Sequence, residues 1–565
     1  MPRRLLPWAP PAAGAVLLLA GAVVAWLLAG TGRDLTPRKH AVVTSRVAAL
    51  AAGAPGTGSG GRGASASGRA SGSDGSVSGR GSGGDPPVTV SVGDRTVGQP
   101  IAPGFLGFSF EFQAVRTYTG TNAAQINPVL VQLIRNLTPG QAPVLRIGGD
   151  STDVSYAPAP GVKPPAYVSY TLTPSWMATT AALAKDLGAR MILGLNLAAN
   201  EPSLAAAEAR DYIKAFGAGA IDALEIGNEP NVYAKITVYH TVFGVPVPAR
   251  PKDFAYPAFR GQFRAIAAAA PQLPLAGPAL AIGPTPGPGS WVHVMAGFLR
   301  SQPRVRTMTV HRYPLRNCYV PPSSPQYPTI SHLLSSYATV GLAASLTRWI
   351  GMAHRAGRAL RVDELNSVAC RGKAGVSDTF ASALWATDAL FSLARAGVDG
   401  VDLHTLPNAA YELFQFSHRS SGWQGSVRPV YYGLQLFAQA APAGSQLLQV
   451  ARRGSDTGLS AWATRAPDHV IRVVLINKNA THRRRITVTV PPGSASAATV
   501  EWMAAPSVAS RGGVTLGGRS YGAVTATGRL AAPRVTNVSA ANDRVTVSVP
   551  HGSAALLTFG APAGG

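Results

Sequence analysis

Eight short apolar segments alternate with helical stretches between residues 105 and 440, and this alternation is what most constrains the fold. The apolar segments have the length and composition of buried parallel strands, and the stretches between them repeat apolar residues at three- and four-residue spacing. The expected strands are 105–111, 144–149, 190–197, 223–229, 273–280, 308–314, 360–367 and 399–405. Because no strand is followed by a GxGxxG loop, eight such units in succession predict a TIM barrel rather than an open doubly wound sheet.

After residue 440 the sequence pattern changes to short segments of alternating apolar and polar residues, separated by Gly, Pro, Asn and Ser. This pattern is typical of a β-sandwich. A further alternating segment, VTVSV at 88–92, has no place in the barrel, and we expect it to pair with the C-terminal sheet. The predicted fold is therefore an α/β chain with a (β/α)8 TIM barrel at 105–439 and a β-sandwich domain at 440–565 that the strands of 87–104 join.

The N-terminal region has the pattern of a membrane segment and a linker. Arg3 and Arg4 precede an uncharged run whose most apolar part, 12–29, is about long enough to cross the ~30 Å hydrocarbon core of a bilayer. We expect residues 1–33 to be an uncleaved transmembrane signal anchor, with a cleaved signal peptide as the alternative. Residues 34–86 are expected to form a disordered Gly/Ser/Arg-rich linker. The charge before the span predicts an extracytoplasmic body, anchored at the cell surface or secreted.

The chain is strongly basic, with a formal net charge of +24. A basic surface suits acidic polysaccharides, anionic membranes or nucleic acid, and a merely solvated arginine-rich surface is an equally good interpretation. No nucleic-acid-binding motif is present, so we expect no nucleic-acid partner. The two cysteines, Cys318 and Cys370, are too few for a disulfide framework and lack the spacing of a metal site.

Two glutamates end expected strands on opposite sides of the ring. Glu229 follows the apolar strand of ALEIGNE, and Glu364 lies in VDELNS on the seventh strand. Catalytic groups of TIM barrels stand at the carboxyl ends of strands, and a retaining glycosidase needs two carboxyl groups about 5–5.5 Å apart. We assign the general acid/base to Glu229, because its apolar strand and neighbouring amide favour a raised pKa, and the nucleophile to Glu364.

Other polar side chains at strand ends fit the same site. Arg146 is expected to keep the nucleophile ionised, and His311 and Tyr313 to orient it, although each of them also suits a structural hydrogen bond or ion pair. Asp363 points to the opposite face if its strand is regular, so we leave it out of the site. The residues expected to bind sugar hydroxyls are Glu111, Asp150 and Asn228.

The motifs LRIGGDSTD, EIGNEPN, HRYP and DELNS, in this order, resemble glycoside hydrolase family 79, the β-glucuronidase and heparanase-like group. The resemblance runs from about residue 88 to the C-terminus. It implies a retaining hydrolase that holds a glucuronate carboxylate with backbone amides after the nucleophile strand and with a tyrosine after strand eight. The matching positions are the loop 367–375, with Gly372 as the best amide candidate, and His404 with Tyr411.

The sequence departs from this family in the loop after Glu364, which lacks the glycine triplet of the heparanase-like members. The loop carries Cys370, Arg371 and Lys373 instead. If strands six and seven are neighbours, Cys318 and Cys370 lie in adjacent loops and a disulfide between them is expected. Arg371 or Lys373 is a candidate for a direct uronate contact, but an exposed loop charge is more often only solvated.

The predicted function is hydrolysis of β-linked glucuronic acid in an extracellular glycan by double displacement. The alternatives are the same mechanism on a neutral sugar, such as an arabinofuranoside or xyloside, and a surface glycan-binding protein without activity. The presence of both carboxylates argues against the inactive form. The reaction needs only water, so neither a cofactor nor a metal is expected, and the partners are an acidic oligo- or polysaccharide and the membrane.

Overall fold

The structure is a computed structural model that describes residues 88–560 except 166, 241–244, 288 and 455–457. The expected membrane segment at 1–33 and linker at 34–86 lie outside the described residues. Within the part of the chain that the structure describes, no helix is both long enough and apolar enough to cross a membrane.

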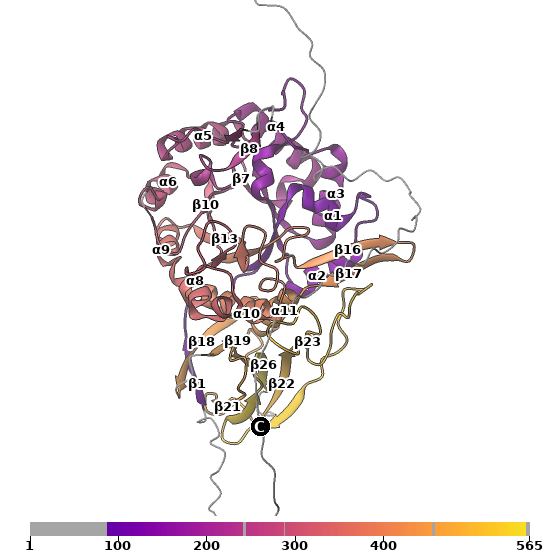
Figure 1. Ribbon diagram of the computed structural model, residues 1–565, viewed down its shortest axis with the longest axis vertical. Coiled ribbons are helices and arrows are strands. Elements are labelled where there is room, and N and C mark those ends of the chain that lie inside the picture. Colours follow the sequence, from indigo (N-terminus) through magenta and orange to yellow (C-terminus); the bar gives the residue numbers. More distant parts are fainter. Residues whose placement is uncertain (1–87, 166, 241–244, 288, 455–457, 561–565) are drawn as a thin grey trace, which may run out of the picture. The chain divides into compact units, whose positions relative to one another are not determined.

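Eight parallel strands close into a barrel in the order β2-β3-β6-β7-β10-β11-β13-β15 (Figure 1). The predicted TIM barrel is therefore confirmed, and each expected apolar segment contributes one strand. The strands are β2 (Leu106–Glu111), β3 (Val144–Gly148), β6 (Arg190–Leu195), β7 (Ile221–Ile226), β10 (Leu275–Ala281), β11 (Val305–His311), β13 (Ala359–Leu365) and β15 (Gly400–Thr405).

Helices follow the strands and cover the barrel (Figure 1). The helix α3 shows how their ends are encoded: the Thr173 side chain accepts a hydrogen bond from the Trp176 N–H, Pro174 takes the first helical position, and Gly188 ends the helix with a φ of +61°. The helices are α1 (Phe112–Thr119), α2 (Pro128–Leu137), α3 (Pro174–Leu187), α4 (Pro202–Phe216), α5 (Tyr256–Ala269), α6 (Met295–Ser301), α7 (Ile330–Leu334), α8 (Val340–Ala344), α9 (Thr347–Arg355), α10 (Phe380–Ala396) and α11 (Pro429–Ala440).

Short strand pairs decorate the loops of the barrel. They are β4 (Ser155–Tyr156) with β5 (Tyr170–Thr171), β8 (Thr237–His240) with β9 (Pro246–Pro248), β12 (Leu315–Arg316) with β14 (Val368–Ala369), and β16 (Phe414–Arg419) with β17 (Gly422–Val427). The pair β12–β14 matters most for function, because it ties the loop after β11 to the loop after β13.

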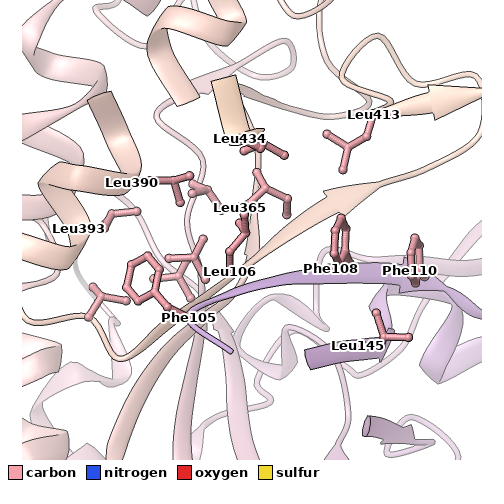
Figure 2. Packing of buried hydrophobic residues seen from close by; sticks show 14 of the residues in the cluster. Phe105, Leu106, Phe108, Phe110, Leu145, Leu365, Leu390, Leu393, Leu413 and Leu434 are labelled. Carbon is pink, nitrogen blue, oxygen red and sulfur yellow. The ribbon is translucent and has the colours of Figure 1, made fainter. Parts of the chain in front are cut away.

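The barrel core joins strands to the helices that cover them. Figure 2 shows Leu390 and Leu393 of α10 and Leu434 of α11 beside the barrel strands, with Phe108 and Phe110 on one side of β2. All six residues of β2 are buried, as expected for a strand that has neighbours on both faces. This packing fixes the strand ends from which the polar side chains project.

The remaining strands form a β domain built from one continuous sheet. The predicted β-sandwich is corrected in this respect: the sheet runs in the order β23-β22-β26-β20-β19-β18-β1-β21-β25, and β24 pairs with β22. The strand at the N-terminal end of the described chain, β1, lies between β18 and β21. The strands are β1 (Val88–Thr96), β18 (Gln446–Arg453), β19 (Leu459–Arg465), β20 (Ile471–Asn477), β21 (Arg484–Thr489), β22 (Ala497–Ala504), β23 (Thr515–Leu516), β24 (Thr536–Ser539), β25 (Arg544–Val549) and β26 (Ser553–Phe559).

The sheet is curled because its two halves share one apolar core while one half also packs on the barrel. In β20, Val473 and Leu475 point into the core of the β domain, whereas Val474 and Ile476 belong to the barrel core. Alternate residues of a strand face opposite sides, so β20 is buried on both. Helices α10 and α11 lie between barrel and sheet (Figure 1).

Candidate active site

Arg146, on β3, is the hub of a polar cluster at the carboxyl ends of the barrel strands. Its guanidinium is fully buried and donates through Nε to Glu225 (2.8 Å), through Nη1 to Ser109 and Glu364 (3.1 Å each), and through Nη2 to Asn228 (2.8 Å). Burial disfavours the charged guanidinium, but Glu225, Asp363 and Glu364 outweigh it and raise the pKa of Arg146. Arg146 is therefore a permanent cation at the bottom of the site.

Arg146 also sets the tautomer of His311. Its Nη2 lies 3.3 Å from Nε2 of His311, and an arginine can only donate, so Nε2 must accept. The imidazole proton is consequently on Nδ1, which lies 3.0 Å from Oε1 of Glu229 and 3.6 Å from Oε2 of Glu364. His311 thus presents an N–H to the two carboxylates.

Glu364 is held as a carboxylate. The Tyr313 hydroxyl donates to its Oε1 (2.8 Å) and Arg146 donates to its Oε2 (3.1 Å). Burial would raise the pKa of Glu364, but electrostatic attraction to His404, His311 and Arg146 and the hydrogen bond from Tyr313 lower it to about 2. An ionised, oriented carboxylate is what nucleophilic attack requires.

Glu229 stands opposite Glu364 in a more open position. Its side chain is 22% exposed, against 11% for Glu364, and its backbone has a φ of +51°, which is unusual for a residue other than glycine. The backbone N–H of Glu229 donates to the Ala279 carbonyl and holds this conformation. One ligand-type atom each of Glu229, His311 and Glu364 lies within 4.8 Å of the others. Such a trio resembles a metal site, but the Nδ1 that faces both carboxylates carries a proton and has no lone pair to offer.

His404 links the nucleophile to the expected uronate side of the site. Its Nδ1 lies 2.8 Å from the Tyr313 hydroxyl, 3.1 Å from the Tyr411 hydroxyl and 3.4 Å from Glu364, and its Nε2 lies 3.5 Å from Glu111. Burial works against the charged ring, but Glu364 and Glu111 raise the pKa of His404. The two carboxylates thereby favour the charged form of His404 next to Glu364.

Two acidic residues predicted to bind sugar differ in how free they are. Glu111 accepts from the backbone N–H groups of Asp150 (3.1 Å) and Ser151 (2.8 Å) and from the Ser151 hydroxyl, so most of its acceptor capacity is used inside the protein. The Asp150 carboxyl, by contrast, accepts only from the Asn228 side chain (3.1 Å) among the hydrogen bonds of the described residues. Desolvation and then the nearby carboxylates of Glu111 and Glu229 raise the pKa of Asp150.

The loop after β13 carries Gly372 and is fastened on two sides. Cys370, Arg371 and Gly372 all have positive φ, between 62° and 78°. The Arg371 carbonyl accepts from the Ala410 N–H (2.9 Å), and a Cβ at Gly372 would come within 2.9 Å of the Tyr411 nitrogen. On the other side a disulfide joins Cys370 to Cys318 in the loop after β11. The glycine is required here, and it brings the loop against Tyr411.

Asp363 contradicts the expectation from a regular strand. Its side chain is fully buried in the cluster, with Oδ2 3.9 Å from Nε of Arg146 and Oδ1 3.6 Å from Nε2 of His311. The reason is a register shift between β11 and β13, where Val310 pairs with Val362 but His311 pairs with Glu364. The extra residue in β13 lets Asp363 and Glu364 both approach Arg146.

Three other buried residues of the site were not predicted. Glu225 pairs with Arg146 and accepts from the Thr309 hydroxyl (2.9 Å), and Asp153 accepts from the backbone of Asn228 (3.1 Å) and from the Tyr233 hydroxyl (2.5 Å). For Glu225 a signal existed, because a glutamate inside the apolar run ALEIG is costly to bury without a partner. For Asp153 and Tyr233 only the folded chain shows the contact.

Comparisons with known proteins agree with this architecture. The model of the glycosyl hydrolase family 79 C-terminal beta domain matches residues 461–556. A β-glucuronidase of Neurospora crassa is 23% identical over 430 residues, which cover 69% of this chain and 74% of that protein.

Solved structures share the fold. A 4-O-α-L-rhamnosyl-β-D-glucuronidase of Fusarium oxysporum has a TM-score of 0.63 at 20% identity, over 83% of this chain and all of that chain. An arabinofuranosidase of family 51 from Xanthomonas axonopodis pv. citri has a TM-score of 0.58 at 15% identity, over 84% of this chain and all of that chain.

A TIM barrel with a trailing β domain and a carboxylate pair at the barrel mouth defines the chain as a glycoside hydrolase. The matched C-terminal domain and the β-glucuronidase relative then place it more narrowly. The resemblance to glycoside hydrolase family 79 that the motifs predicted is thus confirmed by the family's C-terminal domain at residues 461–556 and by the β-glucuronidase relative.

Proposed function

We propose that this chain hydrolyses β-linked glucuronic acid with retention of anomeric configuration, with Glu364 as the nucleophile and Glu229 as the general acid/base. The observation that carries the proposal is the approach of two carboxyl groups, to within 4.8 Å, in environments that differ. That separation leaves no room for the water that an inverting enzyme places between its carboxylates.

The first step follows from the state of each group. The ionised Glu364 attacks the anomeric carbon while Glu229 gives its proton to the glycosidic oxygen, so the aglycone leaves as an alcohol and a glycosyl ester remains on Glu364. The N–H on Nδ1 of His311 supports the carboxylate that Glu229 becomes. In the second step Glu229 takes a proton from water, which attacks the anomeric carbon and releases Glu364.

The other predicted residues have matching roles. Arg146 and Tyr313 orient Glu364 through its two oxygens. Asn228 is fixed by Arg146 on its oxygen, so its amide nitrogen is the atom that faces Asp150 and the sugar side. We expect these two side chains to bind hydroxyls, and the more committed Glu111 to hold His404 and the loop at Ser151.

The preference for a uronate rests on the loop after β13. Gly372 and Tyr411, the two positions that family resemblance assigns to the carboxylate, lie against each other although they are 39 positions apart in the sequence. The Neurospora crassa and Fusarium oxysporum relatives are both named as glucuronidases. The basic balance of the chain also suits an acidic glycan.

An extracytoplasmic location is part of the proposal. A disulfide between Cys318 and Cys370 persists in an oxidising compartment, and the expected anchor or signal at 1–33 would deliver the enzyme there. Membrane attachment and the division into a catalytic part at 105–439 and a β domain at 440–565 belong to the same proposal.

The test is a panel of chromogenic β-glycosides with residues 87–565 and with the variants Glu229→Gln and Glu364→Gln. Release from the β-glucuronide that both variants abolish is the expected result. Turnover of an arabinofuranoside or xyloside but not of the glucuronide would keep the catalytic pair and discard the uronate pocket. A folded protein that turns over none of them, including longer acidic oligosaccharides, would contradict the enzyme assignment.

A further inference from the structure

Asp363 is the buried charged residue that the proposed mechanism leaves unused. Its side chain is fully buried, and neither oxygen has an N–H or O–H donor at hydrogen-bond distance among the described residues. The Arg146 guanidinium lies nearby, with its Nε 3.9 Å from Asp363, but the N–H of that nitrogen already donates a hydrogen bond to Glu225 at 2.8 Å. The ionised form of a carboxyl group without donors is strongly disfavoured in such a place.

If Asp363 were ionised, the carboxylates around it would outnumber the single guanidinium of Arg146. Glu225 and Glu364 both bond to Arg146, and an ionised Asp363 would make three carboxylates around a single arginine. Nε2 of His311, 3.6 Å from Oδ1 of Asp363, accepts from Arg146 and so offers Asp363 no N–H. Asp402, on β15, is committed to Arg361 at 2.7 and 2.8 Å.

We propose that Asp363 is a protonated positioning residue, which donates a hydrogen bond to Glu225 and so leaves the charge of Arg146 to be shared by Glu225 and the nucleophile alone. Asp363 and Glu225 are close enough for the charge of one to act on the other, and a pair of adjacent carboxyls holds one proton in preference to none. Burial, followed by the charge of Glu225, raises the pKa of Asp363 well above its ordinary value.

This arrangement shapes the site geometrically. With Asp363 protonated, Glu225 accepts from Asp363 as well as from the Thr309 hydroxyl and Nε of Arg146, and so fixes the guanidinium at Nε. With Nε pinned, Nη1 and Nη2 can only point to Glu364 and to Asn228 with His311. Loss of the proton would add a charge that draws Arg146 away from Glu364. The role for catalysis rests on the proposed function, but the protonation state does not.

The variant Asp363→Asn tests the proposal, because asparagine copies a neutral carboxyl and can donate to Glu225. We expect its kcat on the β-glucuronide to stay within about threefold of the native value, and its activity to persist at higher pH, where native Asp363 loses its proton and Asp363→Asn has none to lose. Asp402→Asn is the matched control, since the same change there removes a needed carboxylate and should lower the melting temperature.

Two readouts do not depend on turnover. The infrared spectrum of the native protein at pH 7 should contain a protonated-carboxyl C=O band that Asp363→Asn lacks.

The groups facing Asp363 are Glu225, Glu364, Arg146, His311, Asp402 and Arg361. Since the folded pKa is raised, native stability falls as pH rises above the unfolded value, so the unfolding constant of the native protein should grow by up to roughly tenfold per pH unit relative to Asp363→Asn.

Each result bears on one claim. An inactive native enzyme with the infrared band present would overturn the proposed function but not the protonated Asp363. An active native enzyme in which Asp363→Asn loses more than a hundredfold in kcat, or melts as low as Asp402→Asn, would overturn the inference. Absence of the infrared difference would overturn it as well.

Discussion

At the scale of single residues, the two carboxylates differ because their neighbours differ. Glu364 receives hydrogen bonds from Arg146 and Tyr313 and lies beside His404, whereas Glu229 meets only the N–H of His311 among side chains of the described part and remains partly open to water. These two environments suit the two roles that we propose for the same amino acid, attack and proton transfer.

Tyr313→Phe removes one of the two hydrogen bonds to Glu364 without opening a cavity. A hydrogen bond to a charged group contributes about 1.5–3 kcal/mol, so kcat on the β-glucuronide should fall roughly 10- to 100-fold. Steady-state kinetics, with a melting curve as the control for folding, measures the effect. A kcat within a factor of two of the native value would show that Tyr313 does not orient the nucleophile.

His404→Gln tests the electrostatic account by its effect on pH dependence. Loss of the cation next to Glu364 should raise the pKa of this carboxyl from about 2 towards its ordinary value of about 4.3. Because the nucleophile must be ionised, activity is lost as pH falls through that pKa, and the acid limb of kcat/KM should move to higher pH in the variant. An acid limb that does not move would mean that His404 carries no charge.

The sequence located most of the polar residues that the structure brings together at the barrel mouth, because a polar side chain that ends a buried strand is itself the signal. The prediction for Asp363 failed, because side chains alternate between the two faces only in a regular strand. The register shift beside His311 leaves no signal in the amino-acid sequence. Glu225 was readable in principle, as a glutamate inside an apolar run, whereas the pairing of Asp153 with Tyr233 arises only from tertiary contact.

At the scale of elements, the apolar segments located every barrel strand, whereas the side on which we propose that the uronate binds is formed by loops. The loop after β13 departs from a simple turn through three consecutive residues with positive φ, and it is held by β14, by Ala410 and by the disulfide. Non-glycine residues in this conformation cost of order 1–3 kcal/mol each, so the restraints are needed to keep the loop in place.

Replacing both cysteines, Cys318→Ser with Cys370→Ser, should loosen that loop. The disulfide spans 52 residues, and its loss should lower the free energy of unfolding by about 2–4 kcal/mol. We expect KM for the β-glucuronide to rise more than kcat falls, because the loop holds the expected carboxylate contact and not the catalytic pair. Kinetics and thermal melting check both effects. Unchanged KM would separate the disulfide from substrate binding.

At the scale of the whole molecule, the barrel and the β domain are joined through a buried ion pair. Asp388 of α10 accepts from Ser460, Trp462 and Lys478, each at 2.8 Å, and both charged side chains are at most 8% exposed. The alternation of apolar and polar residues after residue 440 predicted that a β domain exists. It did not show that β20 is buried on both faces, because apolar residues on the two faces read alike in one strand.

Asp388→Asn should therefore destabilise the whole chain. The variant leaves Lys478 buried without its counterion, which costs about 3–5 kcal/mol. Asp468→Asn is the control, since it breaks an exposed pair with Arg472 that contributes about 0–1 kcal/mol. Thermal unfolding of the two variants compares them. Equal melting temperatures would show that the two parts do not depend on this contact.

The central claim is that Glu364 becomes covalently attached to the sugar, and a trapping experiment tests it most directly. A 2-deoxy-2-fluoro-β-glucuronide with an activated leaving group should inactivate the enzyme, and peptide mass analysis should place one sugar on Glu364. No label should form in Glu364→Gln. A label on another residue, or turnover of the glucuronide with inverted configuration, would contradict the account.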